Sequence, residues 1–178
     1  VPLPLLLYNM PEMTKHVLEP DTIRRLADCP NIAGVKDSGG DLGYFADVVR
    51  VSQAARPEWS LFVGPELLLP EAYELGGHGA IPGGANVMPR LFTDLDAAVR
   101  AGDTPQVDSL RSQARQLARL YDVGQMPGRI VVGIKTALAA MGICHDAVAS
   151  SFERFGVEQR RRITEILAGL AVGMPREA

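Results

Sequence analysis

Residues 32–40 read Ile-Ala-Gly-Val-Lys-Asp-Ser-Gly-Gly, an apolar run that ends in a lysine and then in a glycine-rich turn. A short apolar run bounded by turn residues is typical of a buried β-strand. The amphipathic stretch 42–55 follows the turn and predicts a helix. This region therefore predicts one strand–turn–helix unit, with Lys36 at the carboxyl end of its strand.

The same alternation of an apolar run, a turn and an amphipathic stretch extends on both sides of this unit. The predicted strands cover residues 3–8, 32–36, 60–63 and 79–81. The predicted helices that follow them cover residues 20–27, 42–55, 66–75 and 89–101. Four strand–helix units in succession favour an α/β fold with a parallel sheet and right-handed crossovers.

The alternation stops after Gly102. The remaining residues predict three helices, at 104–121, 129–141 and 157–170, with no strands between them. We therefore expect two parts, an α/β part at residues 1–102 and a helical C-terminal subdomain at residues 103–178.

Composition excludes several classes of protein. The formal net charge of −3 and the pI near 5.6 argue against nucleic-acid binding, and the only dense basic run, Arg160–Arg162, predicts a solvated helix face. The apolar start of the chain is too short to cross a membrane. Cys29 and Cys144 lie far apart and lack partners at metal-ligand spacing, so we expect no metal site, no disulfide framework and a cytoplasmic protein.

Lys36 is the first candidate for catalysis. It is one of three lysines against fifteen arginines, and ligands of parallel α/β proteins bind at the carboxyl ends of the strands. Partly apolar surroundings disfavour the charged form of a lysine, and a neutral amine is the nucleophile that Schiff-base chemistry with a carbonyl compound needs. Tyr8 closes the preceding strand and could move protons at the same edge of the sheet. The alternatives are a lysine that reaches solvent and an aromatic residue that caps the sheet.

The glycine-rich segment 76–86, Gly-Gly-His-Gly-Ala-Ile-Pro-Gly-Gly-Ala-Asn, is the third chemical feature. Its backbone amides could hold an anion such as a carboxylate. A phosphate loop is the competing interpretation, but no nucleotide-binding signature accompanies it. His78 has no carboxylate partner in the sequence pattern, and we expect a structural role for it.

Three motifs, Tyr-Asn-Met-Pro (8–11), Gly-Val-Lys-Asp-Ser-Gly-Gly (34–40) and the glycine-rich segment, resemble the dihydrodipicolinate synthase/N-acetylneuraminate lyase family in order and spacing. The resemblance covers essentially the whole chain. It implies the C-terminal half of a (β/α)8 TIM barrel, comprising its last four strand–helix units, and a three-helix C-terminal subdomain. It further implies a homo-oligomer, commonly a tetramer, that needs no metal and no cofactor.

The resemblance also assigns roles to residues. Lys36 matches the lysine that forms a Schiff base with pyruvate or a related 2-oxo acid, and Tyr8 matches the proton-relay tyrosine. Gly64 and Ile81 match positions where the backbone lines the 2-oxo-acid site. The expected partner is therefore a small 2-oxo acid, with neither nucleic acid nor membrane.

The sequence departs from the family in three respects. The Gly-Thr-Thr-Gly-Glu segment and four strand–helix units are absent, so either another chain supplies them or the sequence is a piece of a longer protein. Met13 stands where dihydrodipicolinate synthases have an arginine for the carboxylate of the aldehyde. Leu67 and Gly83 stand where sialic acid lyases have an acidic residue and a serine. A lyase or dehydratase acting on a 2-keto-3-deoxy sugar acid is the preferred interpretation. The alternatives are an inactive family member, dihydrodipicolinate synthase itself, or an unrelated phosphate-binding α/β protein.

Overall fold

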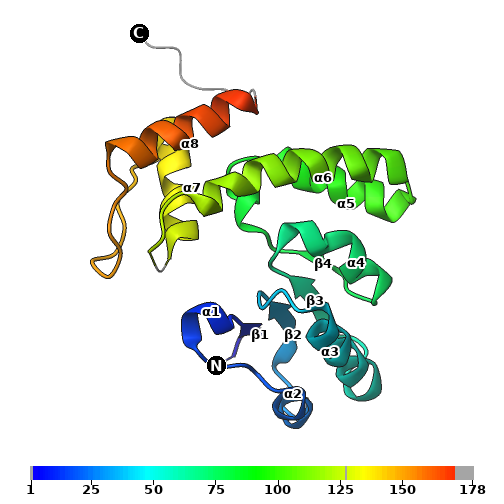
Figure 1. The fold of residues 1–178 in the computed structure, drawn as a ribbon. Coiled ribbons are helices and arrows are strands. Elements are labelled where there is room, and N and C mark those ends of the chain that lie inside the picture. Colours follow the sequence, from blue (N-terminus) through cyan, green and yellow to red (C-terminus); the bar gives the residue numbers. More distant parts are fainter. Residues whose placement is uncertain (1, 127, 171–178) are drawn as a thin grey trace. The chain divides into compact units, whose positions relative to one another are not determined.

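A computed structural model describes residues 2–126 and 128–170 of the chain. It divides into two compact units, Val1–Pro82 and Gly83–Ala178. The first unit holds all four strands of a parallel sheet in the order β1-β2-β3-β4 (Figure 1). The parallel α/β architecture followed by helices confirms the predicted fold class.

The elements of the first unit alternate as the sequence predicts. Its strands are β1 (Leu5–Asn9), β2 (Ile32–Asp37), β3 (Ser60–Val63) and β4 (Gly79–Ala80). Its helices are α1 (Pro11–Thr14), α2 (Pro20–Leu26), α3 (Leu42–Ala55), the 3-10 turn η1 (Glu66–Leu68) and α4 (Leu69–Glu74). The short helix α1 was not expected, and it begins at a proline, which is favoured in the first turn of a helix.

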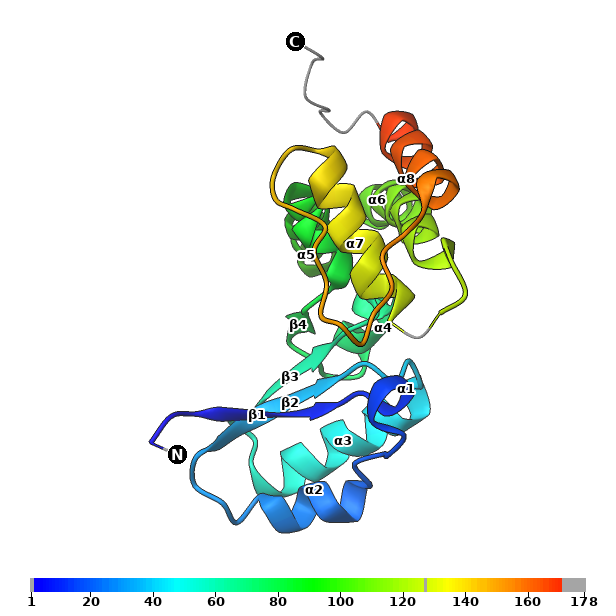
Figure 2. The same cartoon turned by 90° about the vertical axis from the view of Figure 1, so that its left-hand side faces the viewer.

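One face of the sheet is covered by helices. Figure 2 shows α2 and α3 on the same side of β1, β2 and β3. The core between them contains Val35 and Leu61 from the sheet and Ile23, Phe45 and Val48 from the helices, all at most 1% exposed. The opposite face is more open, since Leu6 and Tyr8 of β1 are 44% and 49% exposed.

The second unit is helical. Its elements are the 3-10 turn η2 (Gly83–Asn86), α5 (Pro89–Ala101), α6 (Thr104–Ala118), the 3-10 turn η3 (Arg119–Asp122), α7 (Arg129–Ala140) and α8 (Val157–Gly169). Helices α6, α7 and α8 correspond to the three predicted after Gly102. None of the helices among the described residues is long and apolar enough to cross a membrane.

The observed division of the chain lies between Pro82 and Gly83, whereas the sequence pattern placed the boundary after residue 102. The difference arises because α5 packs against α6 and so falls in the helical unit. That α5 completes the last strand–helix unit of a barrel remains a prediction.

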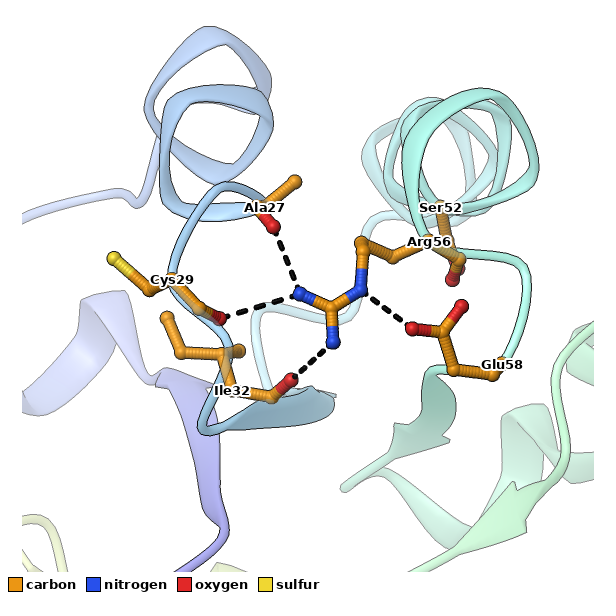
Figure 3. Close-up of polar contacts among 6 residues, drawn as sticks. All are labelled: Ala27, Cys29, Ile32, Ser52, Arg56 and Glu58. Carbon is orange, nitrogen blue, oxygen red and sulfur yellow. Dashed lines mark hydrogen bonds and ion pairs between the residues drawn. The ribbon is translucent and has the colours of Figure 1, made fainter.

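Arg56, just after α3, ties the first unit together at the amino ends of the strands (Figure 3). One Nη atom donates hydrogen bonds to the carbonyl oxygens of Ala27 at 2.8 Å and Cys29 at 3.2 Å. The other donates to the carbonyl of Ile32 at 3.3 Å, and Nε donates to the Glu58 carboxylate at 2.5 Å. A single guanidinium group thus donates hydrogen bonds to three backbone carbonyls, and the Cys29 carbonyl also accepts from the Ile32 amide at 3.2 Å.

Packing and capping hold the Arg56 side chain and backbone in place. The guanidinium carbon lies 5.5 Å from the ring centre of Trp59, whose side chain is 1% exposed. The Ser52 hydroxyl donates a 2.9 Å hydrogen bond to the Arg56 carbonyl, which caps the end of α3. Because the planar fork matches three carbonyls at once, a lysine cannot reproduce these contacts.

We expect Arg56→Lys to lower the free energy of unfolding by about 2–3 kcal/mol, since charge-assisted hydrogen bonds are lost and carbonyls are left unsatisfied. Urea unfolding followed by the fluorescence of Trp59, the only tryptophan, measures this loss in the first unit. The control is Arg50→Lys in α3, because the Arg50 side chain is 74% exposed and forms a surface ion pair with Asp47. We expect this control to change stability by less than about 0.5 kcal/mol. Equal losses in the two variants would contradict the assigned role.

Candidate active site

Tyr8 and Lys36 lie side by side at the carboxyl ends of neighbouring strands. In the parallel register of β1 and β2, Tyr8 is paired with Lys36 and Asn9 with Asp37. Because side chains alternate across a strand, Tyr8 and Lys36 project to one face of the sheet, and Asn9 and Asp37 to the other. The register thus brings together the two residues that the sequence singled out for catalysis.

The two side chains contact each other directly. Lys36 Nζ lies 3.4 Å from the phenol oxygen of Tyr8 and 4.4 Å from the centre of its ring. Tyr8 is half exposed, and Lys36 is partly buried. An amine and a phenol at this separation can exchange a proton through a reacting atom placed between them.

The hydroxyl group of Ser38 lies beside the Tyr8 oxygen. Ser38 Oγ donates a 3.4 Å hydrogen bond to the Tyr8 oxygen. The Tyr8 hydroxyl in turn donates to the sulfur of Met10 at 3.4 Å. The sequence analysis did not single out Ser38. The available signal was its position two residues after a strand-end lysine, in the turn that should face the same edge of the sheet.

On the opposite face, Asn9 and Asp37 form a buried polar pair directly behind the site. Asn9 Nδ2 donates to Asp37 Oδ1 at 2.7 Å, and both residues are at most 2% exposed. Asn9 Oδ1 accepts from the Leu18 amide at 3.0 Å, and Asp37 Oδ1 accepts from the Gly39 amide at 3.0 Å. A buried network whose members are hydrogen bonded fixes one arrangement, so this pair locks the register of Tyr8 and Lys36. Sequence reasoning also missed it.

Tyr44, in contrast to Tyr8, has a structural role. Its hydroxyl donates a 2.6 Å hydrogen bond to the Leu18 carbonyl. Burial raises the pKa of Tyr44 well above its ordinary value, and the charges of Asp37 and Glu19 raise it further. Tyr44 therefore keeps its proton, and its hydroxyl anchors the segment that also binds Asn9.

Gly64 and Ile81 occupy the turns after β3 and β4. The Gly64 amide donates to the Asp37 carbonyl at 2.6 Å, which places Gly64 beside the turn that carries Ser38. The Ile81 amide donates to the Val63 carbonyl at 2.9 Å, and the residue is 43% exposed. The structure thus places Gly64 against Ser38, whose hydroxyl contacts Tyr8, and Ile81 after β4, two strands away from β2. Their contact with a 2-oxo acid remains a prediction.

His78 belongs to the backbone of the sheet. Its Nδ1 accepts a hydrogen bond from the Leu61 amide at 3.0 Å, and its own amide donates to the Leu61 carbonyl at 2.8 Å. These contacts give His78 a structural role at the start of β4. Within residues 2–126 and 128–170, no group of three or more His, Cys, Asp or Glu residues could hold a metal ion.

Comparison with known proteins identifies the family. The sequence model of the Dihydrodipicolinate synthetase family matches residues 1–168. A 4-hydroxy-tetrahydrodipicolinate synthase of Aromatoleum aromaticum is 34% identical over 148 residues, which are 83% of this chain and 48% of that protein. A probable 2-dehydro-3-deoxy-D-pentonate aldolase of Escherichia coli K12, YjhH, is 36% identical over 122 residues, or 68% of this chain and 40% of that protein.

Solved structures give the same result. A dihydrodipicolinate synthase from Bacteroides thetaiotaomicron superimposes with a TM-score of 0.86 and 39% identity, over 95% of this chain and 57% of that one. YagE of E. coli K12, solved in complex with pyruvate, gives a TM-score of 0.85 at 26% identity over 97% and 58% of the two chains. The chain spans about half the length of the curated relatives it matches. Its motifs, its parallel sheet and these matches agree, and the chain belongs to the dihydrodipicolinate synthetase family.

Proposed function

We propose that this chain carries the nucleophile of a class I lyase that acts on pyruvate or a related 2-oxo acid. The observation that carries the proposal is the 3.4 Å contact between Lys36 Nζ and the Tyr8 oxygen at the carboxyl edge of the sheet. An amine next to a proton-carrying hydroxyl is the arrangement that Schiff-base formation requires. Membership of a family that includes aldolases and synthases supports it.

The reaction follows from these two groups. The neutral amine of Lys36 adds to the C2 carbonyl of the 2-oxo acid and forms a carbinolamine. Tyr8 gives a proton to the departing hydroxyl, which leaves as water and produces the imine. Loss of a proton from C3, or cleavage of the C3–C4 bond with departure of an aldehyde, then gives the enamine. Protonation of the enamine at C3 and hydrolysis release pyruvate and restore the free amine.

A 2-keto-3-deoxy sugar acid is the substrate class we favour. Met13, 43% exposed in α1, offers no positive charge to an aldehyde that carries a carboxylate. The nearby Lys15 directs its ammonium group to the Glu12 carbonyl at 2.6 Å. The name of the YjhH relative agrees with this class, whereas the relatives from Aromatoleum aromaticum and Bacteroides thetaiotaomicron are named as synthases. Dihydrodipicolinate synthesis is therefore the alternative reaction. A homo-oligomer in the cytoplasm remains the expected setting.

A binding role without turnover is the second candidate function. The sheet face that carries the site is open, because Leu6 and Tyr8 are 44% and 49% exposed. Water at such a face weakens the electrostatic interactions that assist a charged transition state. Trapping of the imine and measurement of turnover distinguish the two functions.

Incubation with pyruvate and borohydride should add a reduced pyruvate adduct to Lys36 and to no other lysine. The intact mass and the mapped peptide measure this addition. Lys36→Ala should abolish the adduct, because no amine remains beside Tyr8. Lys135→Ala in α7 is the control and should retain it. No adduct from a chain whose circular dichroism shows it to be folded would refute the proposed nucleophile.

Tyr8→Phe should slow imine formation about 100-fold, the usual contribution of a positioned general acid, while the Trp59 unfolding curve stays near that of the wild type. Quenching the reaction with borohydride at several times after mixing gives the rate of imine formation. The matched control is Tyr44→Phe, which should lower stability through loss of the hydrogen bond to Leu18 but leave the rate of imine formation in the folded protein within a few-fold. The opposite pattern would assign the chemistry to Tyr44.

Release of pyruvate from 2-keto-3-deoxy sugar acids should exceed condensation of pyruvate with carboxylate-bearing aldehydes. A coupled pyruvate assay and consumption of the aldehyde measure the two reactions. Met13→Arg should raise condensation relative to cleavage by about tenfold, since one charge-assisted hydrogen bond is worth about 1.5 kcal/mol. Wild-type preference for condensation would favour the synthase alternative.

A further inference from the structure

The side chain of Ser38 fits beside Tyr8 only because residue 64 is a glycine. A Cβ atom on residue 64 would lie 2.0 Å from Ser38 Oγ and 2.9 Å from Ser38 Cβ. Gly64 is not among the residues with positive φ, so its backbone conformation alone does not demand glycine. The constraint on this position is space, and Ser38 fills that space, with its hydroxyl closest, then its Cβ, and its Cα at 3.2 Å.

The Tyr8 oxygen is the meeting point of three groups. It accepts hydrogen bonds from Lys36 Nζ and from Ser38 Oγ, each at 3.4 Å, and its own proton is directed to the Met10 sulfur at 3.4 Å. A thioether is a weak acceptor, so that proton is held loosely. Catalytic hydrogen bonds are often this long without substrate and shorten in the complex with it.

The two donors have different fates in the reaction. Lys36 becomes the imine nitrogen and can no longer donate as an ammonium group. Ser38 takes no part in covalent chemistry, and its hydroxyl remains available to the Tyr8 oxygen at every step. After Tyr8 has given its proton to the departing hydroxyl, the Ser38 hydroxyl is a neutral donor that stabilises the phenol oxygen without taking part in the covalent step.

We propose that Ser38 is a positioning residue that holds the Tyr8 hydroxyl beside the imine, and that Gly64 is required because any side chain there would displace the Ser38 hydroxyl. The inference rests on the proposed function and adds to it a third residue and a reason for the glycine. It gives Gly64 a role that does not depend on contact with the 2-oxo acid.

The spatial part is tested by unfolding, without any assay of activity. Gly64→Ala should lower the thermal midpoint of Trp59 fluorescence by roughly 3–10 °C, the range expected for overpacking in a protein of this size. Ser38→Ala alone should change it by less than about 2 °C. Combined with Gly64→Ala, it should restore part of the loss, because the 2.0 Å contact with Oγ is gone while the 2.9 Å contact with the Cβ of residue 38 remains.

Gly169→Ala is the control for adding a methyl group to a glycine, because, among residues 2–126 and 128–170, no side chain or backbone beyond its own helix and chain neighbours lies within 4 Å of a Cβ at that position. We expect no decrease in its midpoint. Losses for Gly64→Ala and Ser38→Ala that simply add, with no recovery in the double variant, would overturn the spatial claim.

The role of Ser38 in proton transfer is tested by comparing methyl-proton exchange with borohydride trapping. A purely structural role would change both measurements alike. Exchange of the methyl protons of pyruvate with deuterium oxide, followed by NMR, reports proton transfer after the imine has formed. Ser38→Ala should slow this exchange about tenfold, while the final extent of borohydride trapping on Lys36 after long incubation stays within twofold. Ser38→Thr, which keeps a hydroxyl, should exchange within threefold of the wild type. Gly64→Ala should also slow exchange, and Ser38→Ala should add little to that loss.

The outcomes separate this inference from the proposed function. Wild-type exchange rates in Ser38→Ala, with a normal adduct on Lys36, would overturn the role of Ser38 and leave the lyase proposal standing. Absence of any adduct on the wild-type chain would refute the lyase proposal, and the role of Ser38 would fall with it.

Discussion

The in-register parallel pairing of β1 with β2 is the constraint on which the rest of the site depends. It sets Tyr8 against Lys36, and Asn9 against Asp37. A slip of one residue would move the phenol or the amine to the helix-covered face, because side chains alternate with a period of two. The buried hydrogen bond of 2.7 Å between Asn9 and Asp37 opposes such a slip, since a shifted register would leave both groups buried without partners.

The two ends of the sheet are fixed by different chemistry. At the amino ends, the Arg56 guanidinium binds backbone carbonyls in the segment that follows α2 and at the first residue of β2. It also lies over the buried Trp59 ring. At the carboxyl ends, short polar side chains and backbone amides form the network around Asp37. The first arrangement supports the fold far from the chemistry. The second aligns the reactive groups.

Environment also separates residues of the same type. Tyr44 is hydrogen bonded to a backbone carbonyl, and burial raises its pKa, whereas Tyr8 is half exposed and contacts an amine, a hydroxyl and a thioether. Lys36 lies against the Tyr8 ring on the sheet, whereas Lys15 lies at the end of α1 with its ammonium group on a backbone carbonyl. The open sheet face carries the reactive pair, and the covered face carries the core.

The sequence by itself determined the order of strands and helices, the parallel α/β class, and the pairing of Tyr8 with Lys36 at one edge. These follow from hydrophobic periodicity and from the rule that parallel strands end at the same edge, and both are local or topological regularities. Only the tertiary structure placed Ser38 beside Gly64, Asn9 beside Asp37, and Arg56 on three carbonyls. It also placed α5 in the helical unit, which begins at Gly83 rather than after residue 102. These features depend on contacts between residues distant in the chain, and local periodicity carries no information about which distant side chains fill the same space.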